Sequence, residues 1–318
     1  MVKALGLFSG GLDSILAAKL IQEQGIKVEL VNFTTPFFPS KNAIEMAKQL
    51  KLPLKEIDTT KDYLKMLRKP KHGYGSEMNP CIDCKIFMFK KAKKYAKKIN
   101  AKFIFTGEVL GERPMSQNKN SLELIEKEAK LKGKLLRPLS AKLLPITEAE
   151  KKWVDRNKLL DISGRGRKKQ MKLAKKFKIK YPSPSGGCLL TYKEFAKKIR
   201  DLLYHNKRIT RNDLELLKIG RHFRFKSNKI IVGRNEKENK KLLELKQETD
   251  YIFEVPDIGS PITVLQGKKT RETIKKAAQL TARYSDAKEK VKVKYGKKLK
   301  RTLIVINIKE NEIKSLRI

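Results

Sequence analysis

Residues 3–14 of the chain read Lys3-Ala4-Leu5-Gly6-Leu7-Phe8-Ser9-Gly10-Gly11-Leu12-Asp13-Ser14, and this stretch decides the fold. The apolar run from Ala4 to Phe8 predicts a buried strand, which the paired glycines end. From Ile15 to Gln24, apolar residues recur at helical spacing. The order is strand, tight loop, helix, which is how a parallel α/β sheet begins.

The loop between this strand and helix has the features of an anion site. Gly10 and Gly11 permit a sharp turn and a close approach of backbone N–H groups to a ligand. Asp13 and Ser14 open the helix, whose positive end faces the same point. Such a loop binds phosphate or pyrophosphate, although a plain strand-to-helix turn with two glycines is the simpler alternative. It lacks the spacing and lysine of a Walker loop and the G-x-G-x-x-G of dinucleotide-binding folds.

The hexapeptide Ser9-Gly10-Gly11-Leu12-Asp13-Ser14 resembles the S-G-G-x-D-S signature of the PP-loop ATP pyrophosphatases. This resemblance implies that ATP is cleaved between its α and β phosphates. It implies that Ser9, Gly10, Gly11, Asp13 and Ser14 bind the pyrophosphate, with Mg²⁺ neutralising charge, and that Asp13 is catalytic. It also implies a Rossmann-like fold of the adenine nucleotide α hydrolase type, with the backbone near Phe33 and at Gly107 contacting the adenosine.

Beyond the first helix, strand and helix patterns continue to alternate. This alternation predicts an α/β domain whose mostly parallel sheet carries helices on both faces. Expected strands lie at 26–34, 54–57 and 101–106, and expected helices at 43–50, 62–67, 85–100 and 147–157. Because ligands gather at the carboxyl ends of parallel strands, we expect Gly107 to face the phosphate loop.

The pattern changes near Thr191, where a helix over 192–204 leads into a strand-rich region. We expect strands at 230–233, 251–255, 262–265, 291–295 and 302–308 around one main helix at 270–284. This predicts a smaller C-terminal α+β domain. The expected organisation is a PP-loop domain at 1–190, a helical connector at 191–212 and the α+β domain at 213–318.

The charge of the chain is strongly unbalanced. Lys and Arg number 75 against 34 Asp and Glu, a formal net charge of +41. Such an excess indicates a polyanionic partner, of which nucleic acid is favoured and an acidic membrane surface is the alternative. No stretch approaches the roughly 20 apolar residues of a membrane span, and no signal-peptide pattern precedes the first strand. We therefore expect a cytoplasmic protein without a membrane partner.

Three cysteines, Cys81, Cys84 and Cys188, are the only ones in the chain. Cys81 and Cys84 form a C-x-x-C at the start of the lysine-rich helix expected at 85–100. There the helix dipole and the lysines are expected to lower the thiol pKa values and favour thiolates. Three thiolates can hold a [4Fe-4S] cluster with one iron open. The alternatives are a redox or persulfide pair, a zinc site completed by His72, and inert buried thiols.

A narrower resemblance links three segments to the PP-loop tRNA thiouridylases, the MnmA/ThiI-like tRNA sulfurtransferases. The segments are Asn79 to Lys85, Thr106-Gly107-Glu108, and Ser185-Gly186-Gly187-Cys188-Leu189-Leu190. The resemblance implies that Cys84 and Cys188 are the catalytic cysteines. Three positions depart from the family pattern. Cys81 stands where the family commonly has aspartate, Lys85 replaces an asparagine, and Glu108 replaces a histidine. The third cysteine matches the iron-sulfur-dependent tRNA thiolases of the same superfamily.

The C-terminal region resembles the NFACT-R module, which is thought to bind RNA. The residues that carry this resemblance are Lys229 to Asn235 with Glu238-Asn239, Asp257 to Pro261, Ala277 to Ser285 and Val291 to Tyr295. Ile252-Phe253-Glu254 replaces the module's W-x-H segment, so only binding is implied. A generic α+β accessory domain is the alternative.

Together these features predict an ATP-dependent tRNA sulfurtransferase. It would adenylate the carbonyl of a flipped uridine and replace the oxygen with sulfur, through the cluster or a persulfide. The resemblance favours carbon 2 of the uracil ring over carbon 4 as the position that receives sulfur. Sulfide or a sulfur carrier would supply the sulfur. A homodimer is one option for the oligomeric state. The tRNA backbone would be contacted by three parts of the chain: the helix after Cys84, the segment Arg165 to Lys169, and the C-terminal domain. The other classes are a PP-loop ligase or amidotransferase acting on a small metabolite, and a non-catalytic RNA-binding protein.

Overall fold

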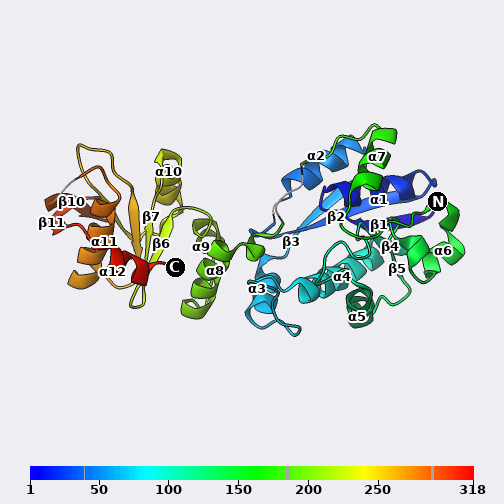
Figure 1. The fold of residues 1–318 in the computed structure, drawn as a ribbon, viewed down its shortest axis with the longest axis horizontal. Coiled ribbons are helices and arrows are strands. Elements are labelled where there is room, and N and C mark those ends of the chain that lie inside the picture. The colour runs from blue at the N-terminus through cyan, green and yellow to red at the C-terminus, as the bar shows by residue number, and fades with distance from the viewer. Residues whose placement is uncertain (39, 184–186, 288–289) are drawn as a thin grey trace. The chain divides into compact units, whose positions relative to one another are not determined.

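The computed structural model describes residues 1–38, 40–183, 187–287 and 290–318. It divides into two compact units, Met1–Thr191 and Tyr192–Ile318. Figure 1 shows one sheet in each unit, with helices packed against it.

The first unit is built on a five-stranded sheet with the order β3-β2-β1-β4-β5. Every pairing is parallel, and Leu5 in the central strand faces Glu29 on one side and Ile104 on the other. The strands are β1 (Lys3–Leu7), β2 (Lys27–Thr34), β3 (Leu54–Asp58), β4 (Phe103–Thr106) and β5 (Leu135–Leu136). The predicted parallel α/β class is confirmed.

Helices cover both faces of this sheet, as the alternating pattern predicted (Figure 1). One apolar core joins the strands to α1 and α2, and another joins them to α4 and α5. The helices are α1 (Leu12–Gln22), α2 (Lys41–Gln49), α3 (Thr60–Arg68), α4 (Cys81–Lys98), α5 (Lys119–Ala129), α6 (Glu148–Lys152) and α7 (Lys168–Lys176). Three short 3-10 helices lie at Ala141–Leu143, Arg156–Lys158 and Leu189–Thr191.

Two helices of the first unit differ from the sequence prediction. Helix α5 was not expected, and its start is fixed by Asn118, whose side chain accepts a hydrogen bond from Ser121 N at 2.9 Å. Helix α6 ends at Lys152, well before the predicted end at residue 157, and a 3-10 turn follows it.

The second unit contains a six-stranded antiparallel sheet with the order β11-β10-β8-β9-β7-β6. The strands are β6 (Arg221–Phe225), β7 (Asn228–Val232), β8 (Tyr251–Glu254), β9 (Thr263–Gln266), β10 (Lys290–Gly296) and β11 (Arg301–Ile306). The helices are α8 (Lys193–His205), α9 (Arg211–Leu216), α10 (Glu236–Leu245), α11 (Arg271–Arg283) and α12 (Glu310–Leu316). The α+β class is confirmed.

The sequence predicted one main helix around these strands, and α11 is that helix. It packs with α12 on one face of the sheet, around Phe223 and Phe253. A second apolar cluster joins the other face to α9 and α10, through Leu216 and Leu242. The second unit is therefore layered on both faces.

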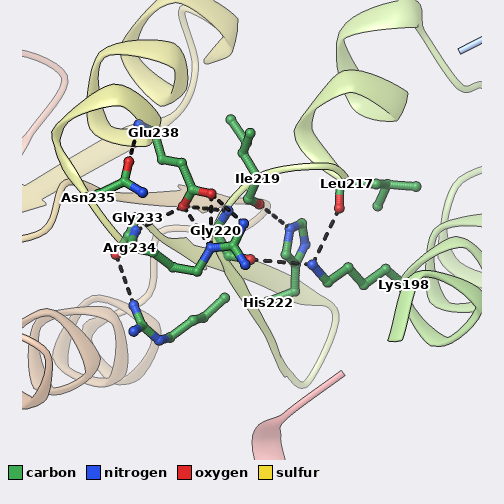
Figure 2. Close-up of polar contacts among 10 residues, drawn as sticks. Lys198, Leu217, Ile219, Gly220, His222, Gly233, Arg234, Asn235 and Glu238 are labelled. Carbon is green, nitrogen blue, oxygen red and sulfur yellow. Dashed lines mark hydrogen bonds and ion pairs between the residues drawn. The ribbon is translucent and has the colours of Figure 1, made fainter. Parts of the chain in front are cut away.

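Helix α8 is tied to the second unit by a network of polar contacts (Figure 2). Lys198 of α8 donates to the carbonyl oxygens of Leu217 at 3.4 Å and Gly220 at 3.3 Å. Glu238 accepts from the backbone nitrogens of Gly220 at 3.1 Å and Arg234 at 3.0 Å. Residues 192–212, expected as a connector, thus group with the second unit, while the boundaries at 190 and 212 stay a prediction.

Within the described residues, no helix has both the length and the apolar character needed to cross a bilayer. The expected cytoplasmic location and the homodimer stay predictions.

Candidate active site

The loop after β1 has the geometry expected of an anion site. Gly10 has φ +75°, and a Cβ there would overlap the backbone of Asn42, so only glycine fits. Gly11 is the N-cap of α1, and no side chain caps this helix end. The Ser14 hydroxyl instead donates to the Gly11 carbonyl at 2.8 Å and lies 3.3 Å from the Ser9 hydroxyl. The first N–H groups of α1 are therefore left for a ligand.

Gly107 follows β4 and lies directly against this loop. A Cβ at Gly107 would come within 2.5 Å of the Ser14 backbone nitrogen. The prediction that Gly107 faces the phosphate loop is confirmed. Phe33, near the end of β2, is buried in the core that faces α4, so only its backbone is available to a nucleotide.

Asp13, in the first turn of α1, has an unusual environment. Burial raises the pKa of its carboxyl group, and Gln170, Arg167 and Arg113 offset this only in part. Its Oδ1 is buried without a hydrogen-bond partner. A carboxylate oxygen of this kind fits a hard cation such as Mg²⁺, whose preferred ligands are oxygens.

Glu112 lies in the same neighbourhood. Its pKa is raised, first by burial and then by the negative charge of Asp13. The sequence analysis identified neither Glu112 nor Arg113 and Gln170, because nothing in the local pattern distinguishes them from ordinary loop and helix residues. It did single out Arg167, but as a tRNA contact.

The cysteines lie on a different pair of elements. Helix α4 begins at Cys81, and the Asn79 side chain donates to the Cys81 sulfur at 3.3 Å. Cys84 follows one turn later and is hydrogen-bonded to the hydroxyl of Tyr63, a buried residue of α3. The charges of Cys81 and Cys84 both act on Cys188, so the three thiols share one neighbourhood. Ser185 and Gly186 of the third motif lie outside the described residues.

The expectation of a lowered thiol pKa is wrong for Cys84. Burial raises the pKa of Cys84 to about 11, and Tyr63 and Lys85 counteract it only partly. Burial also raises the pKa of Cys188 to about 12. Both thiols are therefore protonated at neutral pH, because removal from water outweighs Tyr63 and Lys85 at Cys84 and the backbone hydrogen bond of Leu190 at Cys188.

Among the residues that the structure describes, no three histidine, cysteine or acidic side chains come together closely enough to hold a metal ion. The [4Fe-4S] cluster expected at the three cysteines stays a prediction. His72, the fourth ligand of the zinc alternative, pairs instead with Glu128 at 3.1 Å.

Lys85 and Glu108, two of the departures from the thiouridylase pattern, are partners of each other. Lys85 Nζ lies 3.1 Å from Glu108 Oε1, and Arg137 Nε lies 3.0 Å from Glu108 Oε2. Arg137 also pairs with Glu126. Burial pushes the pKa of Glu108 up, but the two cations outweigh it, so the pKa is lowered. This network joins the residue after Cys84 to the residue after Gly107.

A cavity of about 550 Å³ lies elsewhere in the first unit, between α5, β5 and the segment 141–150. Arg137 and Glu126 line it, but neither the phosphate loop nor any cysteine does. The chemistry indicated by the sequence is therefore not located in this cavity.

Comparisons with known proteins match the two ends of the chain separately. Residues 1–143 match a family described as thiamine biosynthesis protein (ThiI). Residues 220–317 match a family described as NFACT protein RNA binding domain. Residues 1–143 are thus similar to the ThiI family and residues 220–317 to the NFACT RNA-binding family, in agreement with the two resemblances seen in the sequence. The iron-sulfur subtype is not part of either match.

Curated relatives match part of the chain. A "Probable tRNA sulfurtransferase" of Ureaplasma parvum is 32% identical over 130 residues, which is 39% of this chain and 33% of the relative. One from Thermococcus kodakarensis is 30% identical over 120 residues, or 35% of this chain and 30% of the relative. The chain spans about a third of the length of these relatives.

One similar solved structure is described as a 4-thiouridine synthetase–RNA complex with bound ATP. It has 25% sequence identity and a TM-score of 0.37, and covers 56% of this chain and 51% of that one.

Proposed function

We propose that this chain is an ATP-dependent tRNA sulfurtransferase, which replaces a carbonyl oxygen of a tRNA uridine with sulfur. The observation that carries the proposal is the uncapped helix N-terminus behind Ser9–Ser14, in a ThiI-family domain joined to an NFACT-R domain. The half-buried cysteines of the same unit supply a place for sulfur.

In the first step, the loop at residues 9–14 would hold the phosphates of ATP at the start of α1. The uridine carbonyl oxygen attacks the α-phosphorus, and pyrophosphate leaves with the electrons of the broken P–O bond. Bound Mg²⁺ would neutralise the charge that develops on the phosphates, and Asp13 is the residue whose free Oδ1 would hold it. The oxygen is thereby converted into part of a good leaving group.

In the second step, sulfur displaces AMP from the ring carbon. A sulfur carrier would first convert Cys84 or Cys188 into a persulfide. The terminal sulfur attacks the carbon, AMP leaves with the electrons of the C–O bond, and the other cysteine then attacks the remaining S–S bond. The products are thiouridine and a disulfide, which an external dithiol reduces. The placement of Cys84 and Cys188 within electrostatic reach of each other supports this route.

Iron analysis separates the two sulfur routes. In the persulfide route, anaerobically purified protein has no stoichiometric iron and stays colourless. Four irons per chain, lost together in Cys81→Ser, would instead restore the cluster proposal.

The proposed ring carbon differs from carbon 2, which was preferred from the sequence. The similarity of residues 1–143 to the ThiI family supports 4-thiouridine over 2-thiouridine. We therefore propose carbon 4. The match to an RNA-binding family at 220–317 and the net charge of +41 support tRNA as the partner.

The deciding experiment is mass spectrometry of tRNA nucleosides from a deletion strain that carries the wild-type gene, Asp13→Ala or Cys84→Ser. We expect the wild type to restore one thiouridine and both variants to fail. Modification that persists with Asp13→Ala would favour the non-catalytic RNA-binding alternative. A strain with unchanged tRNA but an altered small metabolite would favour the ligase alternative.

A further inference from the structure

Helices α1 and α7 pack against each other (Figure 1), and their contacts show that they run in the same direction. At their starts, Asp13 of α1 meets Gln170 of α7. At their ends, Lys19 of α1 lies 6.0 Å from the ring of Phe177, the C-cap of α7. The two N-termini therefore meet at one point, beside the loop at residues 9–14, and add their positive ends there.

Two turns of the chain bring arginines to this point. Leu110 and Ser163 form a parallel bridge, and Gly164 N donates to the Leu110 carbonyl at 2.7 Å. Gly111 and Gly164 have φ of +77° and +80°, so both turns need glycine. The bridge holds the segment after Gly107 against the segment that leads into α7. As a result, Arg113 and Arg167 both lie near Asp13.

The side chains of Arg113 and Arg167 take no part in the ion pairs that stabilise the described fold. Neither forms an ion pair with a carboxylate among the residues that the structure describes, although the charges of Asp13 and Glu112 both lie within their electrostatic reach. Arg167 is the N-cap of α7 and makes no capping hydrogen bond through its side chain. Two cations and two open helix ends thus converge on one small region.

An independent observation also indicates a missing ligand. Gln170 is fully buried, and its side chain lies within reach of the Asp13 carboxyl group, whose pKa it lowers. Even so, the amide nitrogen and oxygen of Gln170 and Oδ1 of Asp13 have no hydrogen bond of good geometry. Unpaired buried polar atoms cost free energy, so their presence together indicates a site that is completed by a ligand.

We propose that Arg113, Arg167 and the N-terminus of α7 hold the β and γ phosphates of a nucleoside triphosphate, opposite the loop at residues 9–14. The inference rests on the proposed function and adds a second half to its ATP site. Gln170 is a positioning residue that orients Asp13. The role expected for Arg167, contact with the tRNA backbone, is replaced by contact with the leaving pyrophosphate.

The test compares ATP and AMP binding to the full chain by calorimetry with Mg²⁺. Arg113→Gln and Arg167→Gln should each weaken ATP binding about tenfold, the usual effect of losing one charged hydrogen bond. AMP binding should change less than about twofold, because AMP lacks the phosphates that these arginines contact. Arg165→Gln is the matched control, since Arg165 is an exposed arginine of the same segment.

Other outcomes overturn the inference. Equal loss of ATP and AMP in Arg167→Gln would place the arginine elsewhere, and normal ATP binding with weakened tRNA binding would restore the backbone contact. Arg167→Lys, which keeps the charge, should recover part of the ATP affinity and guards against a folding defect. If Arg167→Gln binds ATP like Arg165→Gln while the wild type thiolates tRNA, only this inference fails. If ATP binding changes as expected but no tRNA is thiolated, only the proposed function fails.

Discussion

Gly107 packs so closely on Ser14 that a Cβ at Gly107 would lie 2.5 Å from the Ser14 backbone nitrogen. The atoms in the way are backbone atoms of α1, which cannot rotate aside as a side chain can. The end of β4 therefore determines where the first turn of α1, and its anion-binding N–H groups, can lie.

The first prediction concerns Gly107→Ala. The added methyl group should displace the first turn of α1, which lowers the free energy of unfolding by about 1–3 kcal/mol and weakens ATP binding. Urea denaturation and ATP titration measure the two effects. Gly166→Ala is the control, since nothing lies within 4 Å of a Cβ there. Unaltered ATP affinity in Gly107→Ala would show that the phosphates bind elsewhere.

The second prediction concerns the thiols. Because burial raises the pKa of Cys84 to about 11 and of Cys188 to about 12, both should react slowly with iodoacetamide at neutral pH. Peptide mass spectrometry after timed alkylation, from neutral to alkaline pH, should show their rates rising as the pH approaches these values.

Tyr63 supplies the matching variant. Its hydrogen bond lowers the pKa of Cys84, so Tyr63→Phe should raise that pKa and slow alkylation of Cys84 further. Rapid alkylation of Cys84 at neutral pH in the wild type would mean that its sulfur is a thiolate after all.

These cysteines show which properties could be predicted from the sequence and which could not. The C-x-x-C pattern correctly predicted that Cys81 lies at the start of a helix, because helix signals are local. The pKa prediction was wrong because its cause is not local. Tyr63 comes from α3, and the burial of Cys84 depends on packing that only the fold reveals.

The phosphate loop likewise combines features that could be predicted from the sequence with one that could not. Strand, glycine turn and helix follow one another within residues 3–24, so their order could be predicted in full. The convergence of Arg113 and Arg167 could not, since it depends on the bridge between Leu110 and Ser163. Fold class followed from periodicity, whereas α5, which periodicity missed, begins at a side-chain cap.

The third prediction concerns the buried network at Glu108. Glu108→Gln removes the partner of two cations, one of which, Arg137, is buried. We expect a loss of about 3 kcal/mol in the free energy of unfolding, as for one half of a buried ion pair. Glu148→Gln is the control, because its pair with Lys134 is exposed and should contribute less than about 1 kcal/mol.

The pH dependence of this network has a definite sign. The folded pKa of Glu108 is lowered, so its stabilisation is complete above the usual value of 4.5 and is lost as the pH falls through the folded pKa. Urea midpoints of the wild type should fall in this acidic range, and those of Glu108→Gln should fall less. Equal midpoints for the two proteins at neutral pH would contradict the role of the network.

The last prediction concerns His222 in the second unit. This side chain is fully buried, and its Nε2 lies 2.8 Å from the Ile219 carbonyl oxygen, to which it donates. Burial, with the nearby positive charges of Lys229 and Lys198, holds its pKa well below 6.5. The folded chain therefore keeps His222 neutral under conditions in which the unfolded chain binds a proton.

Because the unfolded state binds more protons in this window, the second unit should lose stability as the pH falls below 6.5 towards the folded pKa. Lys198 and Lys229, whose pKa values are lowered to about 8, act in a separate window between about 8 and 10.5. In His222→Gln, the free energy of unfolding of the second unit should therefore depend less steeply on pH below 7. Urea unfolding at a series of pH values measures this dependence. An unaltered slope in His222→Gln would mean that the imidazole takes up its proton without unfolding the domain.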